Sequence, residues 1–426
     1  MKILAVLLVC SSALVAQSNT YVLKAARLFD SATGQVIAPG LVVVSNGLIQ
    51  SVGGSAPAGA TVLDLGDATL LPGFIDAHTH LSDEFNPDYN GDALQSMQRT
   101  IPEKAIRATA NARKTVMAGF TTVRDVGSED FIDVGLRNAI NAGYVPGPRM
   151  LVSVHALGST GGHCDTGGFR YGLFGRETGP EDGVINSPDQ ARYAVRFNVK
   201  YGADVIKTCA SGGVLSPTDE VDVPQLTQAE LNALVEEAHT LHRKTAAHSH
   251  GAESSKRAIL AGIDSIEHGT FLDDEDMRMM HDRGTFLVPT LTTRVGLAET
   301  KFPPLVRAKA DRAVKQQDIM VRRALALGVK IALGTDAAVF PHGDNALEFA
   351  FMAADGMTPA QSLMAGTTSA AELLGLQDKV GALKPGMLAD VVAVPGNPIE
   401  NIKLTQSVIF VMKDGVILRN DRAVPR

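Results

Sequence analysis

The chain has 426 residues, which exceeds the usual size of one compact core and favours a large domain with a smaller one attached. Hydrophobic residues make up 45% and charged residues 20%, with 41 glycines and no tryptophan, a composition typical of a soluble enzyme built from strand and helix units. The formal charge of -7 and the lack of a Lys/Arg cluster argue against nucleic acid or an anionic membrane as the main partner and favour a small molecule.

The first 18 residues have the pattern of a secretory signal peptide. A positive charge at Lys2 precedes an apolar run that continues to Ala16 and is too short to span a bilayer. The cleavage site stays open between Ala16 and Ser18. Cys10 offers a lipoprotein anchor as a less favoured alternative, because the residue before it is not small. We therefore expect an exported protein, either secreted or periplasmic.

Two cysteines, Cys164 and Cys209, remain after such a signal is removed. Two cysteines are too few for a disulfide framework, so stability must come from the core even in an oxidising compartment. Whether they pair is not legible in the sequence.

Short strand-like runs at both ends of the chain predict an accessory β layer. Asn46-Gly47 separates two apolar runs near the N-terminus, which is a strong hairpin signal. The C-terminal part repeats this style in residues 390–394 and 408–412. Because chain termini usually lie close together at a domain surface, we expect residues 19–70 and 381–426 to form one accessory β-sandwich.

Residues 71–380 alternate between strand-like and helix-like segments. The helical segments stop at glycines, and Thr227 with Glu230 and Thr358 with Gln361 have the pattern of capping boxes. Strands that are each followed by a helix predict a (β/α)8 barrel, with a doubly wound open sheet as the alternative. No glycine-rich phosphate fingerprint supports the open sheet. The expected strands are 74–78, 121–124, 150–154, 205–207, 245–248, 265–268, 286–289 and 330–333.

Side chains that bind metals lie at the carboxyl ends of these strands. His78 and His80 leave one face of the first strand about 7 Å apart, because side chains two apart point the same way. The other candidate metal-binding residues at strand ends are Lys207, His248, His268 and Asp336. In a barrel these ends form the active-site face. A single strand-end histidine is more often a core residue, but burying this many ionisable groups without a metal or a partner network would cost several kcal/mol each. The set therefore predicts a metal site for zinc or a similar ion.

These residues, with the phrases in 71–80, 207–213, 334–336 and 386–390, resemble the amidohydrolase superfamily in its binuclear-metal branch with a carboxylated lysine. The resemblance runs from about Tyr21 to the end of the chain. It implies a barrel with an accessory β-sandwich and two divalent metal ions, with zinc as the expected metal. The implied metal-site residues are His78, His80, Lys207, His248, His268 and Asp336.

The resemblance also implies the chemistry. Lys207 is expected to carry a carbamate derived from carbon dioxide, whose two oxygens bridge the two cations. A bridging water acts as the nucleophile, and Asp336 accepts its proton and passes it to the leaving amine. Lys207 and Asp336 are therefore the expected catalytic residues. A metal-free scaffold protein of the same fold is disfavoured, because all six ligand positions are intact.

Four further residues are candidates for substrate contact. His250 lies two residues beyond His248, and His163 follows a glycine-rich stretch. Arg124 and Arg294 follow strand positions, although ion pairs explain them as well. Weaker candidates are Cys209, Ser82 and Asp344.

The phrases in 161–163, 247–250 and 342–345 look most like the prolidase-like group, which includes dipeptidases, enzymes acting on N-acyl amino acids and hydrolases of ochratoxin A. We therefore expect hydrolysis of an amide bond that releases a C-terminal amino acid. The rival expectation is a cyclic-amide hydrolase of the imidazolonepropionase kind. The expected partner is a small amide or dipeptide, with no nucleic acid and no membrane span. A homo-oligomer stays open, since relatives often assemble.

Overall fold

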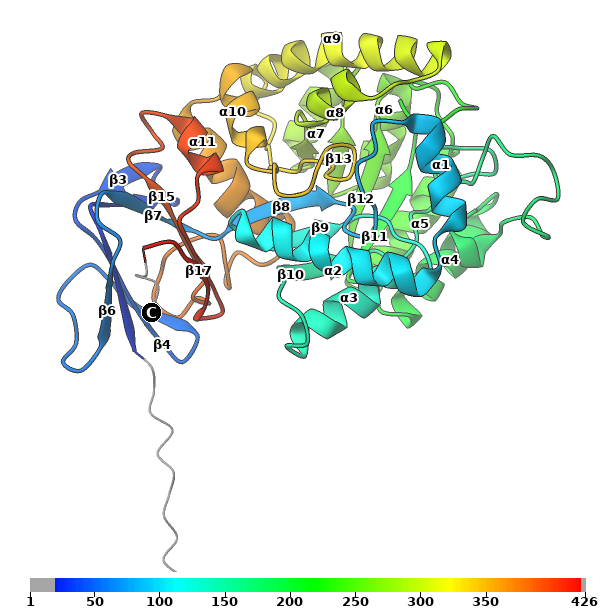
Figure 1. The fold of residues 1–426 in the computed structure, drawn as a ribbon. Coiled ribbons are helices and arrows are strands. Elements are labelled where there is room, and N and C mark those ends of the chain that lie inside the picture. The colour runs from blue at the N-terminus through cyan, green and yellow to red at the C-terminus, as the bar shows by residue number, and fades with distance from the viewer. Residues whose placement is uncertain (1–19, 423–426) are drawn as a thin grey trace, which may run out of the picture.

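The computed structural model describes residues 20–422. The expected signal peptide and Cys10 therefore lie outside the described residues. Figure 1 shows a β-rich part at one end, which contains strands from both ends of the chain, and a larger part in which helices surround a group of strands. Within residues 20–422, no helix is long and apolar enough to cross a membrane.

The β-rich part contains two mixed sheets. One has the order β5-β4-β1-β6 and consists of β1 (Tyr21–Ala25), β4 (Gly40–Ser45), β5 (Leu48–Val52) and β6 (Thr61–Asp64). The other has the order β17-β16-β15-β7-β2-β3 and consists of β2 (Arg27–Asp30), β3 (Gln35–Ile37), β7 (Ala68–Pro72), β15 (Val391–Pro395), β16 (Phe410–Lys413) and β17 (Val416–Asn420). The predicted hairpin is confirmed, since β4 and β5 pair antiparallel on either side of Asn46 and Gly47. The pairing of β15 with β7 places both ends of the chain in one sheet.

The centre of the six-stranded sheet is buried on both faces, as β15 shows. Val391 and Ala393 join an apolar cluster shared with the four-stranded sheet. Val392 and Val394 point the other way and belong to the main core of the larger part. This alternation attaches the β-rich part to the rest of the protein through apolar contacts on both sides.

The larger part contains two parallel sheets. One consists of β8 (Phe74–Thr79), β9 (Phe120–Asp125) and β10 (Arg149–Val152), and the other of β11 (Val205–Cys209), β12 (Lys244–Ser249), β13 (Ser265–His268) and β14 (Phe286–Val288). Backbone hydrogen bonds join them on one side, where Asp204 N donates to Val152 O over 2.7 Å. On the other side, Leu287 N donates to Lys330 O over 2.8 Å and Ala77 N donates to Leu333 O over 2.9 Å.

The expected eighth strand differs from the prediction. Residues 330–333 form only an isolated bridge, between Ile331 and Leu287, although they lie between β14 and β8. A Cβ at Gly334 would lie 2.9 Å from the Cβ of His78, so only glycine fits this close approach to β8. The chain does not continue as a regular strand. It turns instead into the loop that carries Asp336, whose φ is 63°.

Helices follow the strands along the chain and lie outside them in Figure 1. They are α1 (Tyr89–Gln98), α2 (Ile101–Met117), α3 (Ile132–Asn141), α4 (Pro188–Lys200), α5 (Gln228–Thr240), α6 (Ala252–Ala261), α7 (Asp274–Arg283), α8 (Thr293–Glu299), α9 (Pro304–Ala326), α10 (Leu347–Ala354), α11 (Pro359–Met364) and α12 (Ala370–Leu373), with shorter turns at Pro180–Asp182, Ala365–Ser369 and Ile402–Gln406. Both predicted capping boxes are confirmed, at Thr227 and Thr358. Helix α6 ends as expected at Gly262, whose φ of 94° suits glycine.

Candidate active site

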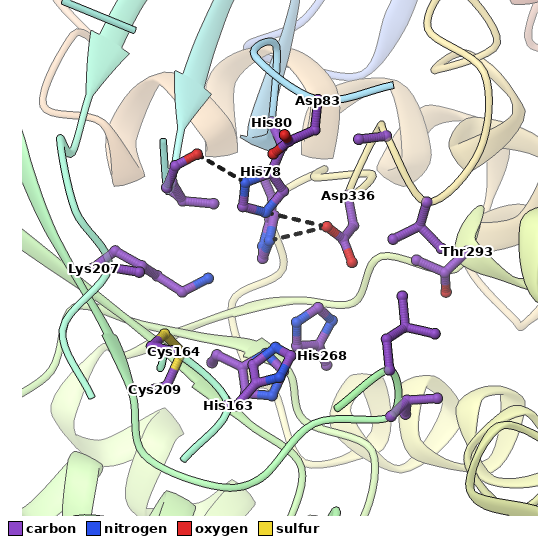
Figure 2. Close-up of a pocket in the computed structure, with 18 of the residues that line it drawn as sticks. His78, His80, Asp83, His163, Cys164, Lys207, Cys209, His268, Thr293 and Asp336 are labelled. Atoms are coloured by element: carbon purple, nitrogen blue, oxygen red, sulfur yellow. Dashed lines mark hydrogen bonds and ion pairs between the residues drawn. A yellow bond between two sulfur atoms is a disulfide. The ribbon is translucent and has the colours of Figure 1, made fainter. Parts of the chain in front are cut away.

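A cavity of about 470 Å³ opens at the carboxyl ends of the parallel strands (Figure 2), a size typical of small-molecule sites. The residues of its inner end come from β8, β11, β12, β13 and the loop after residue 333. They include all the expected metal-site residues, which are His78, His80, Lys207, His248, His268 and Asp336. The structure therefore brings together side chains that are spread over more than 250 residues of sequence.

Two groups of side chains could each hold one ion. In the first, the ligand atoms of His78, His80 and Asp336 lie within 4.8 Å of one another. Asp336 Oδ1 is 3.5 Å from His78 Nε2 and 3.4 Å from His80 Nε2, as the dashed lines in Figure 2 show. A carboxylate and two imidazoles at this spacing fit a divalent cation of the zinc type.

The second group contains His248, His250 and His268, whose ligand atoms also lie within 4.8 Å of one another. The rings of His78 and His268 are 5.1 Å apart, so the two groups adjoin. In Figure 2 the amine of Lys207 points into the cavity beside them. The donor set therefore suits a pair of neighbouring cations.

Four histidines of the site are held in one tautomer by protein acceptors. One ring N–H in each donates to the protein: His78 Nδ1 to the Glu267 carboxylate (2.8 Å), His80 Nδ1 to the Gly127 carbonyl (3.1 Å), His248 Nε2 to the Gly212 carbonyl (3.1 Å) and His268 Nδ1 to the Thr290 hydroxyl (2.7 Å). Thr290 must accept here, because its own hydroxyl donates to the Pro289 carbonyl. The other ring nitrogen of His78, His248 and His268 is left with a lone pair, which is how metal-binding histidines are usually oriented. Burial would also lower the pKa of His80, but the hydrogen bond to Asp336 raises it to about 9, so a bound cation would replace the proton on His80 Nε2.

The backbone is strained at the same place. His268, Thr290 and Asp336 have φ values of 69°, 52° and 63°, in the left-handed region that residues other than glycine rarely adopt. Each such residue costs of order 1 to 3 kcal/mol and persists only where the surroundings hold it. Strain at two expected ligands and at the hydrogen-bond partner of one of them marks this as a functional site.

Burial favours the neutral forms that metal binding and carbamate formation need. It lowers the pKa of His78 to about 4, so this imidazole is neutral near pH 7. Burial also lowers the pKa of Lys207 to about 8, which increases the fraction of neutral amine. Only a neutral amine can take up carbon dioxide.

Glu267 is a functional residue that the sequence analysis missed. It is fully buried and accepts hydrogen bonds from His78 Nδ1 and from Arg124 Nη2, each over 2.8 Å. Burial alone would raise the pKa of Glu267, but the charge of Arg124 and the hydrogen bond from His78 lower it to about 2. The available signal was a glutamate inside the short strand Ser265–His268, directly before a candidate ligand histidine.

Arg124 and Arg294 do not line the cavity, contrary to their expected contact with substrate. Arg124 lies below the site, fully buried, where its Nε donates to the Ala77 carbonyl over 2.6 Å and its charge is paired with Glu267. Arg294 forms an ion pair with Asp355 at 2.6 Å. Both guanidinium groups are neutralised by protein carboxylates, so neither is placed to hold a substrate.

Replacing Glu267 with glutamine should weaken metal binding by roughly 10- to 100-fold, as expected for loss of the group that orients a metal-binding histidine. Metal affinity would be measured by titration with buffered zinc, using only protein that keeps the circular dichroism spectrum of the wild type. Glu275→Gln is the matched control, because Glu275 is an exposed partner of Lys256. Unchanged zinc affinity in the Glu267 variant would show that the contact with His78 is only structural.

The two histidines expected to contact substrate do line the cavity. His163 stacks on His248 with ring centres 4.1 Å apart, and its Nδ1 forms a hydrogen bond with the Ser216 hydroxyl. His250 Nδ1 forms a hydrogen bond with the Thr270 hydroxyl over 2.8 Å. His250 also belongs to the second histidine group, so its position suits either a ligand or a substrate contact.

Cys164 and Cys209 form a disulfide, with Cα atoms 5.9 Å apart. Both line the cavity. The bond joins the loop that carries His163 to the end of β11, two residues after Lys207. Of the weaker candidates, Ser82 and Asp344 do not line the cavity.

Comparison with known proteins agrees with this geometry. The model of the amidohydrolase family matches residues 69–418. Ochratoxinase from Aspergillus niger is 31% identical over 92% of this chain and 86% of its own length. A solved Xaa-Pro dipeptidase with methionine bound in its active site is 39% identical, with a TM-score of 0.89 over 94% of this chain and all of its own. A prolidase solved with N-methylphosphonate-L-proline is 30% identical, with a TM-score of 0.84 over 94% of this chain and all of its own. The chain therefore belongs to the amidohydrolase family and is a metal-dependent hydrolase of amide bonds.

Proposed function

We propose that the protein is a binuclear zinc hydrolase that releases a C-terminal amino acid from a dipeptide or an N-acyl amino acid. His78, His80 and Asp336 would hold one ion and His248 and His268 the other. Lys207 would hold both as a carbamate, formed when its neutral amine bonds to the carbon of carbon dioxide and loses a proton. The observation that carries this proposal is the set of histidines whose second nitrogen is tied to a protein acceptor.

The bound ions would supply a nucleophile from water at neutral pH and polarise the scissile carbonyl. The protein contributes the proton transfer. Asp336 is a carboxylate at neutral pH, because its pKa is held well below its usual range by His78 and His80 although burial would raise it. Its oxygen would accept the proton of the attacking water and deliver it to the nitrogen of the leaving amine.

His163 and His250 would bind the carboxylate of the released amino acid. Both line the cavity next to His248, with ring centres 4.1 Å (His163) and 4.7 Å (His250) from its ring. Two similar proteins support an amino acid as the released product, since one was solved with methionine in its active site and the other with N-methylphosphonate-L-proline.

We also propose that the parallel strands form a closed (β/α)8 barrel and that the two mixed sheets form a β-sandwich. Hydrogen bonds between the two parallel sheets on both sides support the barrel. The apolar cluster shared by the two mixed sheets supports the sandwich. Export from the cytoplasm is a further proposal, which the N-terminal sequence and the disulfide support.

A hydrolysis screen with metal depletion tests the proposed function. Chelation should abolish activity, and zinc, cobalt or manganese should restore it. N-benzoyl-phenylalanine and dipeptides should be cleaved, and the methyl ester of N-benzoyl-phenylalanine should be a poor substrate because it lacks the carboxylate. Turnover by metal-free protein would contradict the metal site, and cleavage of cyclic amides alone would favour the imidazolonepropionase alternative.

A further inference from the structure

The cavity has two unlike sides. One side is polar and carries Ser128, Glu129, His155, Asp165 and Asp182. The other is apolar and consists of Val214, Leu215, Leu297, Ala313 and Val339. Figure 2 shows Thr293, at the base of the apolar side, across the cavity from Lys207 and the disulfide. We call this apolar side, together with Thr293 and Gln317, the side-chain chamber.

The chamber is built from three parts of the chain that meet only in the fold. The loop after β11 contributes Val214 and Leu215, helices α8 and α9 contribute Leu297 and Ala313, and the loop after Asp336 contributes Val339. All five residues belong to one apolar cluster or pack against it, and the cluster also contains the buried Val221. The wall is therefore a packed surface that keeps its shape.

The base of the chamber is polar but already satisfied. Gln317, only 4% exposed, accepts a hydrogen bond from Arg294 Nε over 2.8 Å, and its Nε2 donates to the Thr293 hydroxyl over 3.3 Å. Arg294 is fixed in turn by Asp355. The base thus places no charge in the chamber, and Arg294 acts as a positioning residue for Gln317.

The chamber lies on the side of the leaving amine. Val339 N donates to the Asp336 carbonyl over 3.1 Å, so the apolar side begins next to the residue proposed to protonate that amine. The loop that carries Val214 also carries Ser216, the partner of His163. A Cβ at Gly213 would overlap the His163 ring, so this loop and the proposed carboxylate anchor are in direct contact.

A buried lysine on α9 holds this loop in place. Lys309 Nζ donates to the carbonyls of Gly213, Ser216 and Asp219 over 2.8, 2.6 and 2.9 Å. The carboxylate anchor and the apolar wall are therefore fixed to one another before substrate arrives.

We propose that the chamber binds the side chain of the released amino acid and selects large apolar residues such as phenylalanine, leucine and methionine. This inference rests on the proposed function and adds the side-chain class of its substrate. Because the walls of the chamber are apolar, burial of an apolar side chain there lowers the free energy of binding. A charged side chain would lose its hydration in the chamber without gaining an ion-pair partner. Ala313 determines the depth of the chamber, because a side chain larger than its methyl group at this position of α9 would fill part of the cavity.

The test is a series of N-benzoyl amino acids that differ only in the side chain. For the wild type, kcat/KM should be roughly 10- to 100-fold higher for phenylalanine, leucine and methionine than for glycine, aspartate and lysine. Ala313→Phe should lower the ratio of phenylalanine to glycine by tenfold or more. Ala308→Phe is the matched control, since Ala308 is an exposed alanine on the same helix, and it should keep the wild-type ratio.

Leu297→Ala provides a second variant if Ala313→Phe does not fold. It removes apolar contact from the same packed wall and should also lower the ratio of phenylalanine to glycine. Equal kcat/KM across the wild-type series would overturn the chamber while leaving amide hydrolysis intact. An unchanged ratio in both folded variants would do the same. Failure to cleave any compound of the series would instead overturn the proposed function.

Discussion

Replacing Asp336 with asparagine should lower kcat by roughly 100-fold or more, within the range of general acid-base effects. The amide is close in size to the carboxylate, so the fold and much of the substrate affinity should survive. It cannot accept the proton of the attacking water, however, and it is a weaker partner for the two histidines whose Nε2 atoms lie 3.4 and 3.5 Å from Asp336 Oδ1. Turnover and zinc content would be measured on the same preparations, which separates loss of proton transfer from loss of metal.

Asp344→Asn is the control for this experiment, because Asp344 is exposed in the same region of the chain and does not line the cavity. It should keep wild-type turnover. A near-normal kcat for Asp336→Asn, with full zinc content, would remove Asp336 from the mechanism.

Replacing Lys207 with alanine should abolish activity and lower the zinc content. Lys207 is 3% exposed and lies beside both histidine groups, so its removal leaves the space between two cations without a bridging anion. Formate or acetate should partly restore activity, because a short carboxylate can occupy the place of the carbamate. Activity and zinc would be followed over a range of carboxylate concentrations.

The control is Lys200→Ala, which removes an exposed lysine from the end of α4. It should keep full activity and show no response to acetate. Full zinc content in Lys207→Ala would contradict the bridge. So would a native crystal structure with an unmodified lysine more than about 4 Å from either metal.

The grouping of the candidate ligands could be predicted because each position depends on a local pattern. His78 lies in β8 and His80 directly after it, and Lys207, His248 and His268 lie near the ends of short buried strands, so the parallel arrangement brings them together in one cavity. Arg124 shows the limit of this argument. It also precedes the end of its strand, but its side chain turns toward Glu267 below the cavity, and the depth of a side chain is decided by packing between strands.

Features that depend on contacts between distant segments could not be predicted from the sequence. The side-chain chamber needs α8 and α9 to meet the loop after β11, and no spacing along the chain indicates that contact. The eighth strand was expected from its apolar residues, but these form only an isolated bridge to β14, and the chain then passes close to His78 at Gly334 and turns into the loop of Asp336. Whether Cys164 and Cys209 pair could not be predicted either, because they lie 45 residues apart and only the fold brings them together.

The disulfide has a practical consequence for preparing this protein. It closes a loop of 45 residues, which by loss of chain entropy alone corresponds to about 4 kcal/mol, and disulfides form only under oxidising conditions. When it is reduced, two thiols line the same cavity as the metal-site histidines, and thiolates are strong ligands for zinc. The disulfide therefore has to form before the metal is added, so that the two cysteines cannot compete with the histidines for zinc. A protein refolded with zinc in a reducing buffer and one exported through an oxidising compartment can differ in their metal site while having the same sequence.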